Sequence, residues 1–394
     1  MKTTTKFLLV TIAYLDFVIL GLSSGLLGVA WPSIRQTFGA PLDAVGALLL
    51  TTTAGYLLAS FTNGASIARI GVGALLLVGT VIAGVGPLGY TAAPAWWVMV
   101  AIGFIAGLGS GVVDAGLNTY IATNHGPTLM NWLHACFGLG ATFGPLLMTG
   151  IINRGYSWRW GYVIVATLNL ALALGFTFTL KHWRLKETHH PTHPGAAPVK
   201  KASSLDTLRL PIAWLGIALF VVFTGIEGSA GQWAYSLFTE ARAITPAVAG
   251  MWVSVYWGVF TAGRILFGFV AARVGLIPLL RTCTVGAIVG AALLWSNVNN
   301  TASCLGLALI GLCVAPMFPS STSSTPQRVG EAHAANAIGF QVAAGGLGFA
   351  LLPSLAGVLA RAIGLEIVGP FLLAASAVTF LLHEAIVRRR PPSV

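Results

Sequence analysis

Residues 64–71 read GASIARIG, and residues 268–275 read GFVAARVG. The two runs share their first glycine, the Ala-Arg pair and the last glycine, at an offset of 204 residues. The same offset places Gly21 on Gly225, far outside the two runs. Single glycine matches are common in a glycine-rich chain, but a run held at constant offset is not. The chain is therefore predicted to be a duplication of two similar halves.

The composition indicates the environment of these halves. Hydrophobic residues make up 56% of the 394 residues and charged residues 8%, whereas a soluble domain carries about 25% charged residues. A soluble enzyme, a DNA-binding protein, a disordered chain and a coiled coil are all poor fits. Long unbroken apolar runs, without the alternation of barrel strands, favour a helical membrane protein.

The apolar runs predict twelve spanning helices, because one crossing needs about 20 apolar residues. We therefore expect an all-α polytopic membrane protein with two pseudo-symmetric six-helix bundles, 1–182 and 209–394, and a polar cytoplasmic linker at 183–208. The predicted spans are 7–31, 43–68, 73–92, 95–121, 129–152, 158–181, 210–238, 246–272, 276–297, 300–322, 333–361 and 366–387.

The basic residues predict the orientation. Of the 21 Lys and Arg residues, 15 fall in the termini and in the loops on the termini's side of the predicted membrane. Short loops rich in Lys and Arg stay on the cytoplasmic side. We therefore expect cytoplasmic termini and a multi-pass, monomeric protein of the cell membrane. The net charge of +11 then needs no nucleic-acid partner.

No metal site is expected. The four cysteines, Cys136, Cys283, Cys304 and Cys313, all fall in predicted spans without paired metal-ligand spacing. His189, His190 and His193 stand beside prolines in the linker, which favours a plain flexible segment.

Ionisable residues inside the spans are the most informative ones, because burying a charge costs at least about 2.5–3.5 kcal/mol. Asp114 shares a helix face with Asn118, Gly107 and Gly111. This small, polar face is expected to point into the bundle or a cavity, where an acid can take up a proton near neutral pH. Asp114 is our first candidate for proton coupling; the alternative is a structural hydrogen bond, for example to His134.

Glu227 and Asp16 are further proton-coupling candidates. Glu227 lies in GIEGSAGQW (225–233), where three glycines weaken the helix and favour a break that lines a cavity. The alternative is that this span ends early, near the outer water. Asp16 either shares proton traffic with Asp114 or pairs with Arg264, which is assigned to structure or gating.

Several uncharged or weakly basic groups are candidates for substrate binding, because amides facing lipid would be costly. Arg69 and Arg273 are assigned to gating or structure, near cytoplasmic helix ends. The substrate-binding candidates are Asn118, Asn131, His134, Gln232, Trp233, Asn336 and Gln341.

The two GxxxARxG runs resemble the cytoplasmic loop signature of the major facilitator superfamily, with Ala68 and Ala272 in the acidic position. Asp114 with Asn118, and Met317-Phe318-Pro319, are similar to motifs in helices four and ten of its fucose–galactose–glucose proton symporters. This resemblance implies that Asp114 is the proton-linked acid and Asn118 a sugar-facing residue.

These features predict a proton-coupled symporter for a sugar or a similar small polar metabolite, working by alternating access between the two halves. The chain has no GxxxxGK[ST] phosphate loop for ATP and no recognisable enzyme motif, so an ion gradient is the expected energy source and no cofactor is expected. Sodium remains an alternative coupling ion. A proton-driven efflux antiporter is the second reading. A membrane receptor is a distant third, because the termini look too short for an output domain.

Overall fold

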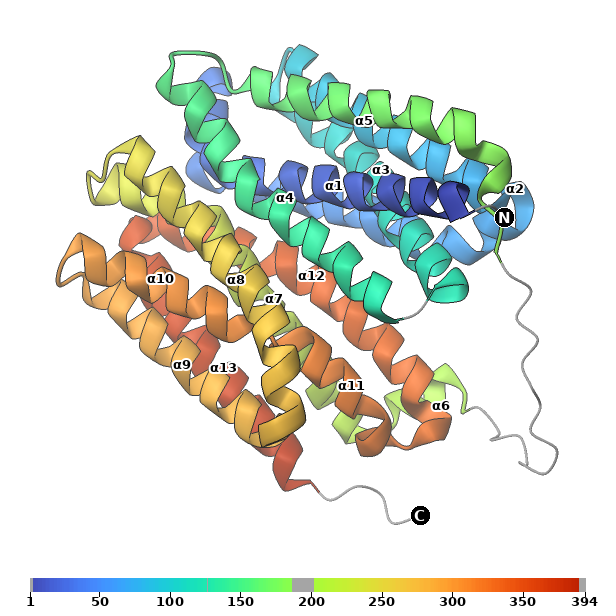
Figure 1. Cartoon of the computed structure of the whole chain (residues 1–394). Coiled ribbons are helices and arrows are strands. Elements are labelled where there is room, and N and C mark those ends of the chain that lie inside the picture. Colours follow the sequence, from blue (N-terminus) through green and yellow to red (C-terminus); the bar gives the residue numbers. More distant parts are fainter. Residues whose placement is uncertain (1–2, 126, 186–201, 390–394) are drawn as a thin grey trace. The chain divides into compact units, whose positions relative to one another are not determined.

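The structure is a computed structural model that describes residues 3–125, 127–185 and 202–389. These residues form helices joined by short turns, and none of them lies in a β-strand (Figure 1). The prediction of an all-α protein is therefore confirmed. The linker histidines His189, His190 and His193 lie outside the described residues.

The chain divides into two compact units. The first holds the helices up to η2, together with Ile244–Gly258 from the start of α8. Its elements are α1 (Thr3–Phe38), η1 (Leu42–Ala44), α2 (Val45–Ala92), α3 (Trp96–Asn124), α4 (Pro127–Asn153), α5 (Arg159–Thr179) and η2 (Leu180–His182).

The second unit holds α6, α7, η3, the rest of α8 from Val259, and every later helix. Its elements are α6 (Ser204–Leu208), α7 (Pro211–Ser236), η3 (Leu237–Ala241), α8 (Pro246–Val274), α9 (Leu276–Ser296), α10 (Asn300–Val314), α11 (Met317–Val329), α12 (Glu331–Ile363), η4 (Leu365–Ile367) and α13 (Val368–Arg388).

Within the described residues, 11 segments are long and apolar enough to cross a membrane. The longest, Leu42–Ala92, has 51 residues, about 77 Å at 1.5 Å per residue, whereas a bilayer core is about 30 Å thick. The backbone of α2 is non-helical at Gly71, with φ 79° and ψ 156°. Predicted spans 43–68 and 73–92 therefore form one element with an internal break.

The corresponding glycine of the second run has the same backbone conformation. Gly275, between α8 and α9, has φ 85° and ψ 159°, a region open almost only to glycine. The two matching sequence runs thus end in matching turns.

Two predicted spans end too early: 7–31, because α1 runs on to Phe38, and 300–322. We expected one helix over 300–322, but α10 ends at Val314 and α11 runs on to Val329. Pro316 lies in the two-residue break between them. The hydroxyls of α11 then bond to its own carbonyls, as Thr322 does to Phe318 O at 2.9 Å. These bonds extend the polar helix beyond the apolar run that predicted it.

Glycines decide how closely the helices pack. In the first unit α3 lies on α2, and a Cβ on Gly107 would overlap the carbonyl oxygen of Thr52. Gly140 of α4 lies equally close to the Val18 carbonyl of α1. Apolar side chains fill the space between α1, α2, α3 and α5, among them Phe17, Leu76, Leu117 and Phe176.

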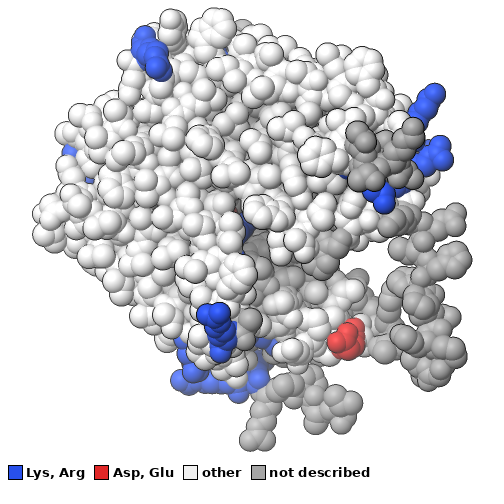
Figure 2. Space-filling model, in the orientation of Figure 1, with Lys and Arg blue, Asp and Glu red and all other residues white. Residues whose placement is uncertain are grey.

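The outer surface is apolar. On the face drawn in Figure 2, most atoms belong to residues that are neither basic nor acidic. Phe61, Phe178 and Phe269 are all largely exposed. Exposed aromatic and aliphatic side chains in these numbers suit a lipid environment rather than water.

Candidate functional site

Asp114 lies in the middle of α3, where that helix packs on α2. Gly111 and Gly107, one and two turns earlier, bring α3 against the α2 backbone, so the carboxylate reaches a side chain of α2. Tyr56 Oη donates to Asp114 Oδ2 at 2.5 Å, and Asn118 Nδ2 donates to Oδ1 at 3.0 Å. Both partners are uncharged.

The sequence analysis missed Tyr56. It is a tyrosine in an apolar run, and nothing local marks it as a partner for an acid 58 residues away. Only the α2–α3 packing brings the two together. The alternative partner expected for Asp114, His134, instead places its ring edge-on to Phe17, with the ring centroids 5.7 Å apart.

The polar contacts continue one turn further along α3. Asn63 of α2 donates to Ala115 O at 3.3 Å and to Thr119 Oγ1 at 3.2 Å. Its Oδ1 is buried without a hydrogen-bond partner in the described part of the chain. We call Tyr56, Asn63, Asp114, Asn118 and Thr119 the α2–α3 polar seam.

Asp16 occupies a different contact, between α1 and α2. It is buried and accepts a hydrogen bond from Thr80 Oγ1 at 3.0 Å. Thr80 also reaches its own helix at Leu76 O. Asp16 and Asp114 therefore have different partners, and neither has a cationic partner among the described residues.

Glu227 of α7 faces Arg264 of α8. Glu227 Oε1 lies 3.9 Å from Arg264 Nη2, and the guanidinium carbon lies 4.4 Å from the Phe260 ring centroid. Arg264 thus faces Glu227 within the second unit, whereas Asp16 accepts from Thr80 within the first. Glu227 is also mostly buried, with 12% of its side chain exposed, which does not fit the alternative of an early helix end.

The expected break in α7 is wrong. The glycine-rich stretch 225–233 is continuous helix, and α7 runs to Ser236. The glycines serve close packing instead, because a Cβ on Gly225 would overlap Leu352 of α12 and one on Gly228 would crowd the Phe349 carbonyl. Tertiary packing outweighs the weak helix propensity of glycine.

Three candidates on α7 and α12 differ in what they can still bind. Trp233 is fully buried and donates to Pro353 O at 2.8 Å, so it is a packing residue here and not the expected aromatic wall. Gln341 accepts from Thr325 Oγ1 at 2.8 Å. Gln232 alone retains a buried amide nitrogen without a partner among the described residues.

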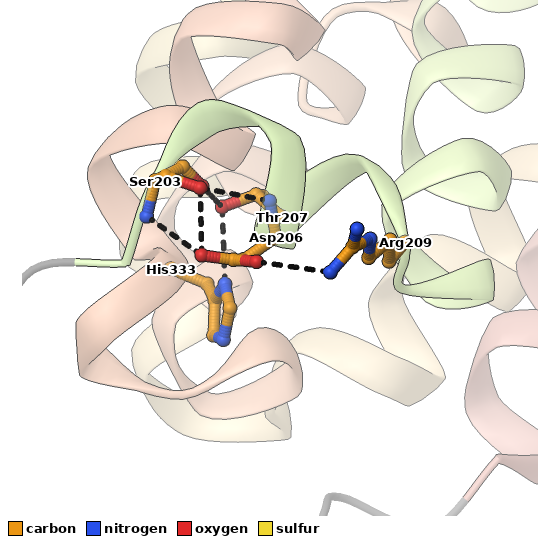
Figure 3. Close-up of polar contacts among 5 residues, drawn as sticks. All are labelled: Ser203, Asp206, Thr207, Arg209 and His333. Carbon is orange, nitrogen blue, oxygen red and sulfur yellow. Dashed lines mark hydrogen bonds and ion pairs between the residues drawn. The ribbon is translucent and has the colours of Figure 1, made fainter.

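Asn336 lies at the start of α12 and holds the segment before α7. It donates to Ala202 O at 2.9 Å and to Thr207 Oγ1 at 3.2 Å. His333 Nδ1 lies 3.0 Å from the same hydroxyl (Figure 3). This cluster ties α6 to α12 and separates Asn336 from the other substrate-binding candidates.

The remaining candidates are exposed. Asn131 and His134 lie on the exposed side of α4. Arg69 and Arg273 are exposed, two residues before Gly71 and Gly275 respectively.

Long apolar helices with acids held inside them define a multi-pass membrane protein of the transporter class. The chain belongs to the major facilitator superfamily: the sequence model described as "Major Facilitator Superfamily" matches residues 14–240 and 215–394. Members of this family are membrane transporters, so the protein is a transporter and not an enzyme, and its partners are a small-molecule substrate and the lipid bilayer.

Curated relatives are distant. The chain is 26% identical to the glucose/mannose transporter GlcP of Bacillus subtilis, over 57% of this chain and 56% of that protein. It is 24% identical to the sodium-dependent glucose transporter 1A of Mus musculus, over 88% of each. It is 33% identical to the class G tetracycline resistance protein of Vibrio anguillarum, over 34% of this chain and 33% of that protein.

A solved structure has the same fold. It is a bacterial homologue of the human lysosomal transporter Spinster, in an inward-facing and unoccupied conformation. The TM-score is 0.80 at 14% identity, with each chain fully covered.

Proposed function

We propose that this protein is a proton-coupled symporter that carries a sugar or a similar small polar metabolite by alternating access. The observation that carries the proposal is the carboxyl group of Asp114, held inside a candidate span by Tyr56 and Asn118, with no cationic partner among the residues that the structure describes. A paired acid would have to break its ion pair before accepting a proton. Asp114 would only have to exchange hydrogen-bond roles.

Tyr56 makes that exchange possible. A tyrosine hydroxyl is both donor and acceptor, so it donates to the carboxylate and can accept from the carboxylic acid. Loss of the charge lowers the cost of enclosing the group in an apolar protein. In the proposed cycle the protonated, loaded carrier changes its facing, and the proton leaves with the substrate.

The proposal includes the topology and the location. We propose that α2 crosses the membrane twice, on either side of Gly71, which brings the 11 candidate segments to twelve crossings with cytoplasmic termini. The cell membrane is the proposed location. The halves would divide at the linker 183–208, and the protein would act as a monomer.

The substrate class is supported by the two glucose-transporting relatives. Gln232, with its unpartnered amide nitrogen, and Asn118 are the proposed sugar-facing amides. Asn131, His134 and Gln341 remain secondary candidates, and Asp16 and Glu227 are secondary proton sites. The coupling ion is proposed to be H⁺, with Na⁺, named in the mouse relative, as the alternative.

Uptake by purified protein in liposomes tests the proposal. One proton per substrate and a gradient of one pH unit support about tenfold accumulation. Asp114→Asn should reduce accumulation to about onefold while substrate exchange continues, because the amide resembles the protonated acid. Asp206→Asn, the same change outside the spans, should accumulate normally. Accumulation that survives in Asp114→Asn contradicts the assignment of Asp114 as the proton-coupling residue. Accumulation driven only by a sodium gradient would show that the coupling ion is Na⁺ and not H⁺.

The tetracycline-resistance relative favours one alternative, a proton-driven efflux antiporter. The same liposomes decide between the two. Proton-driven export of a tetracycline or a cationic dye, with no sugar uptake, would establish the antiporter.

A further inference from the structure

The guanidinium of Arg264 has more N–H donors than its contacts among the described residues use. A guanidinium has five N–H donors in a fixed planar fork. The contacts of Arg264 within the described residues are Glu227 at 3.9 Å and the Phe260 ring at 4.4 Å. The first distance is too long for a hydrogen bond, and Arg264 Nε is buried without a partner in the same part of the chain.

Two other arginines of the same unit each have a bidentate carboxylate partner, although Nη1 of Arg242 is also buried without a hydrogen-bond partner among the described residues. Arg242 binds both oxygens of Glu366, at 2.8 and 2.6 Å. Arg281 binds both oxygens of Glu384, at 2.5 and 2.8 Å. Arg264 therefore differs from its neighbours by lacking a bidentate partner.

The position of Arg264 makes this lack costly. It lies within the candidate span Pro246–Ala271, beside the exposed side chains of Ile265 and Leu266. A cation in a span is expensive unless it is paired. The side chain is nevertheless 29% exposed, so part of it is accessible to a ligand. Phe260 stacks against it and limits its movement.

We infer that the substrate of this transporter carries a carboxylate, which binds the free fork of Arg264. The inference rests on the proposed function and narrows it from small polar metabolites to acids such as sugar acids. A carboxylate matches the fork with two parallel hydrogen bonds. A phosphate dianion fits less well, because the contacts of Arg264 among the described residues include no second Lys or Arg.

In this proposal Glu227 is the anion beside Arg264 until the substrate binds. Its loose contact partly neutralises Arg264 while the site is empty, and the substrate carboxylate displaces it. Two opposite effects follow. Loss of Arg264 should weaken binding of the acid, whereas neutralising Glu227 removes a competing anion and should leave binding unchanged or tighter. A merely structural ion pair would be damaged equally by either change.

Matched sugars test the inference on the full-length protein in liposomes. Glucose and glucuronate, or galactose and galacturonate, differ only in a hydroxymethyl or carboxylate group at C6. We expect binding and uptake of the acid in preference to the neutral sugar. Arg264→Gln should weaken equilibrium binding of the acid, measured without a proton gradient, by about 10- to 100-fold, and Glu227→Gln should not. Arg154→Gln, which replaces an exposed arginine, is the matched control.

Two results would overturn the inference and leave the proposed function standing. The first is proton-driven uptake of neutral sugars that Arg264→Gln does not impair. The second is an equal loss of binding of the acid in Arg264→Gln and Glu227→Gln. Thermal unfolding of each variant excludes loss of folding as the cause. Arg264→Lys keeps the positive charge but loses the planar pair of N–H donors. Unchanged affinity for the acid in that variant would therefore also contradict the inference. If no sugar and no sugar acid is bound or carried, the proposed function fails as well.

Discussion

Both oxygens of the Asp114 carboxylate are occupied by uncharged donors, Tyr56 Oη from α2 and Asn118 Nδ2 from its own helix. Asp16 has one such donor, Thr80. Glu227 faces a cation at 3.9 Å. These three residues look alike in the sequence, but the structure gives each a different set of neighbours.

Tyr56→Phe should shift the pH dependence of uptake and leave substrate affinity nearly unchanged. In the proposed cycle Tyr56 bonds both forms of Asp114, but the bond to the charged form is the stronger, so its loss lets the protonated form persist to higher pH. Because the two bonds differ by about 1 kcal/mol, the midpoint of the uptake profile should rise by about 0.7 pH unit. Uptake measured from pH 5 to 9 checks this, with Tyr156→Phe at an exposed site as the control. An unmoved midpoint would reduce Tyr56 to a packing residue.

Arg242→Gln should destabilise the second unit. The Arg242 side chain is 2% exposed, and it binds Glu366 and the Leu294 carbonyl. Its loss leaves that carbonyl unpaired, which should cost about 1–3 kcal/mol. Glu366 is 47% exposed, so water can replace part of its partner, and Glu366→Gln should cost less. Thermal unfolding in detergent measures both, and equal losses would disprove this ordering.

Among the elements, the breaks after the two GxxxARxG runs are fixed by backbone conformation. Gly71 and Gly275 have positive φ with extended ψ, whereas the first glycines of the runs, Gly64 and Gly268, are helical with open space around them. The first and last glycines of each run therefore have different roles.

Gly71→Ala should lower stability by about 1–3 kcal/mol, because an alanine in this backbone region is strained. Gly64→Ala should be neutral or slightly stabilising, since alanine favours helix over glycine. Melting temperatures of the two variants, in detergent at equal concentration, make the comparison. If the two alanines behave alike, the break at Gly71 is not required.

The short helix α6 depends on its N-terminal cap. Hydrogen bonds from the Ser203 side chain and backbone hold the pKa of Asp206 below its ordinary value, with smaller contributions from Arg209 and His333. A lowered pKa means that the stabilisation is present above the ordinary value, near 4, and is lost as the pH falls through the value in the folded protein.

Asp206→Asn should therefore speed hydrogen exchange of the amides in 203–207 at pH 7, and the difference from the natural chain should vanish at low pH. Ser203→Ala should act in the same direction, because it removes the N-cap. Ser204→Ala, at the adjacent serine, is the control. A difference that persists unchanged at low pH would show that the charge of Asp206 does not matter.

For the whole molecule, the proposed twelve crossings predict which side of the membrane each loop between helices faces. Single cysteines report this directly. Ala40→Cys and Tyr156→Cys should react with a membrane-impermeant thiol reagent from outside intact cells. Ile70→Cys and Arg184→Cys should react only after permeabilisation. Labelling of Ile70→Cys from outside would show that α2 does not cross twice.

At this scale, much of the fold follows from composition and spacing. Apolar runs of about 20 residues and repeated glycine motifs were enough to predict a helical membrane transporter with two similar halves, because lipid forces the backbone into helices. The end of the predicted span 300–322 was misplaced because the hydroxyl side chains of α11 bond to carbonyls of their own helix, so the helix continues through a polar segment.

The site could be predicted only in part, for a physical reason. An ionisable residue inside an apolar run is visible along the chain, and Asp114, Asp16, Glu227 and Arg264 were found in that way. Their partners come from other helices: Tyr56 for Asp114, Thr80 for Asp16, Glu227 for Arg264. The cost of burying a charge is a property of the residue and its segment, whereas the group that offsets this cost is chosen by helix packing, which brings together residues far apart in the chain.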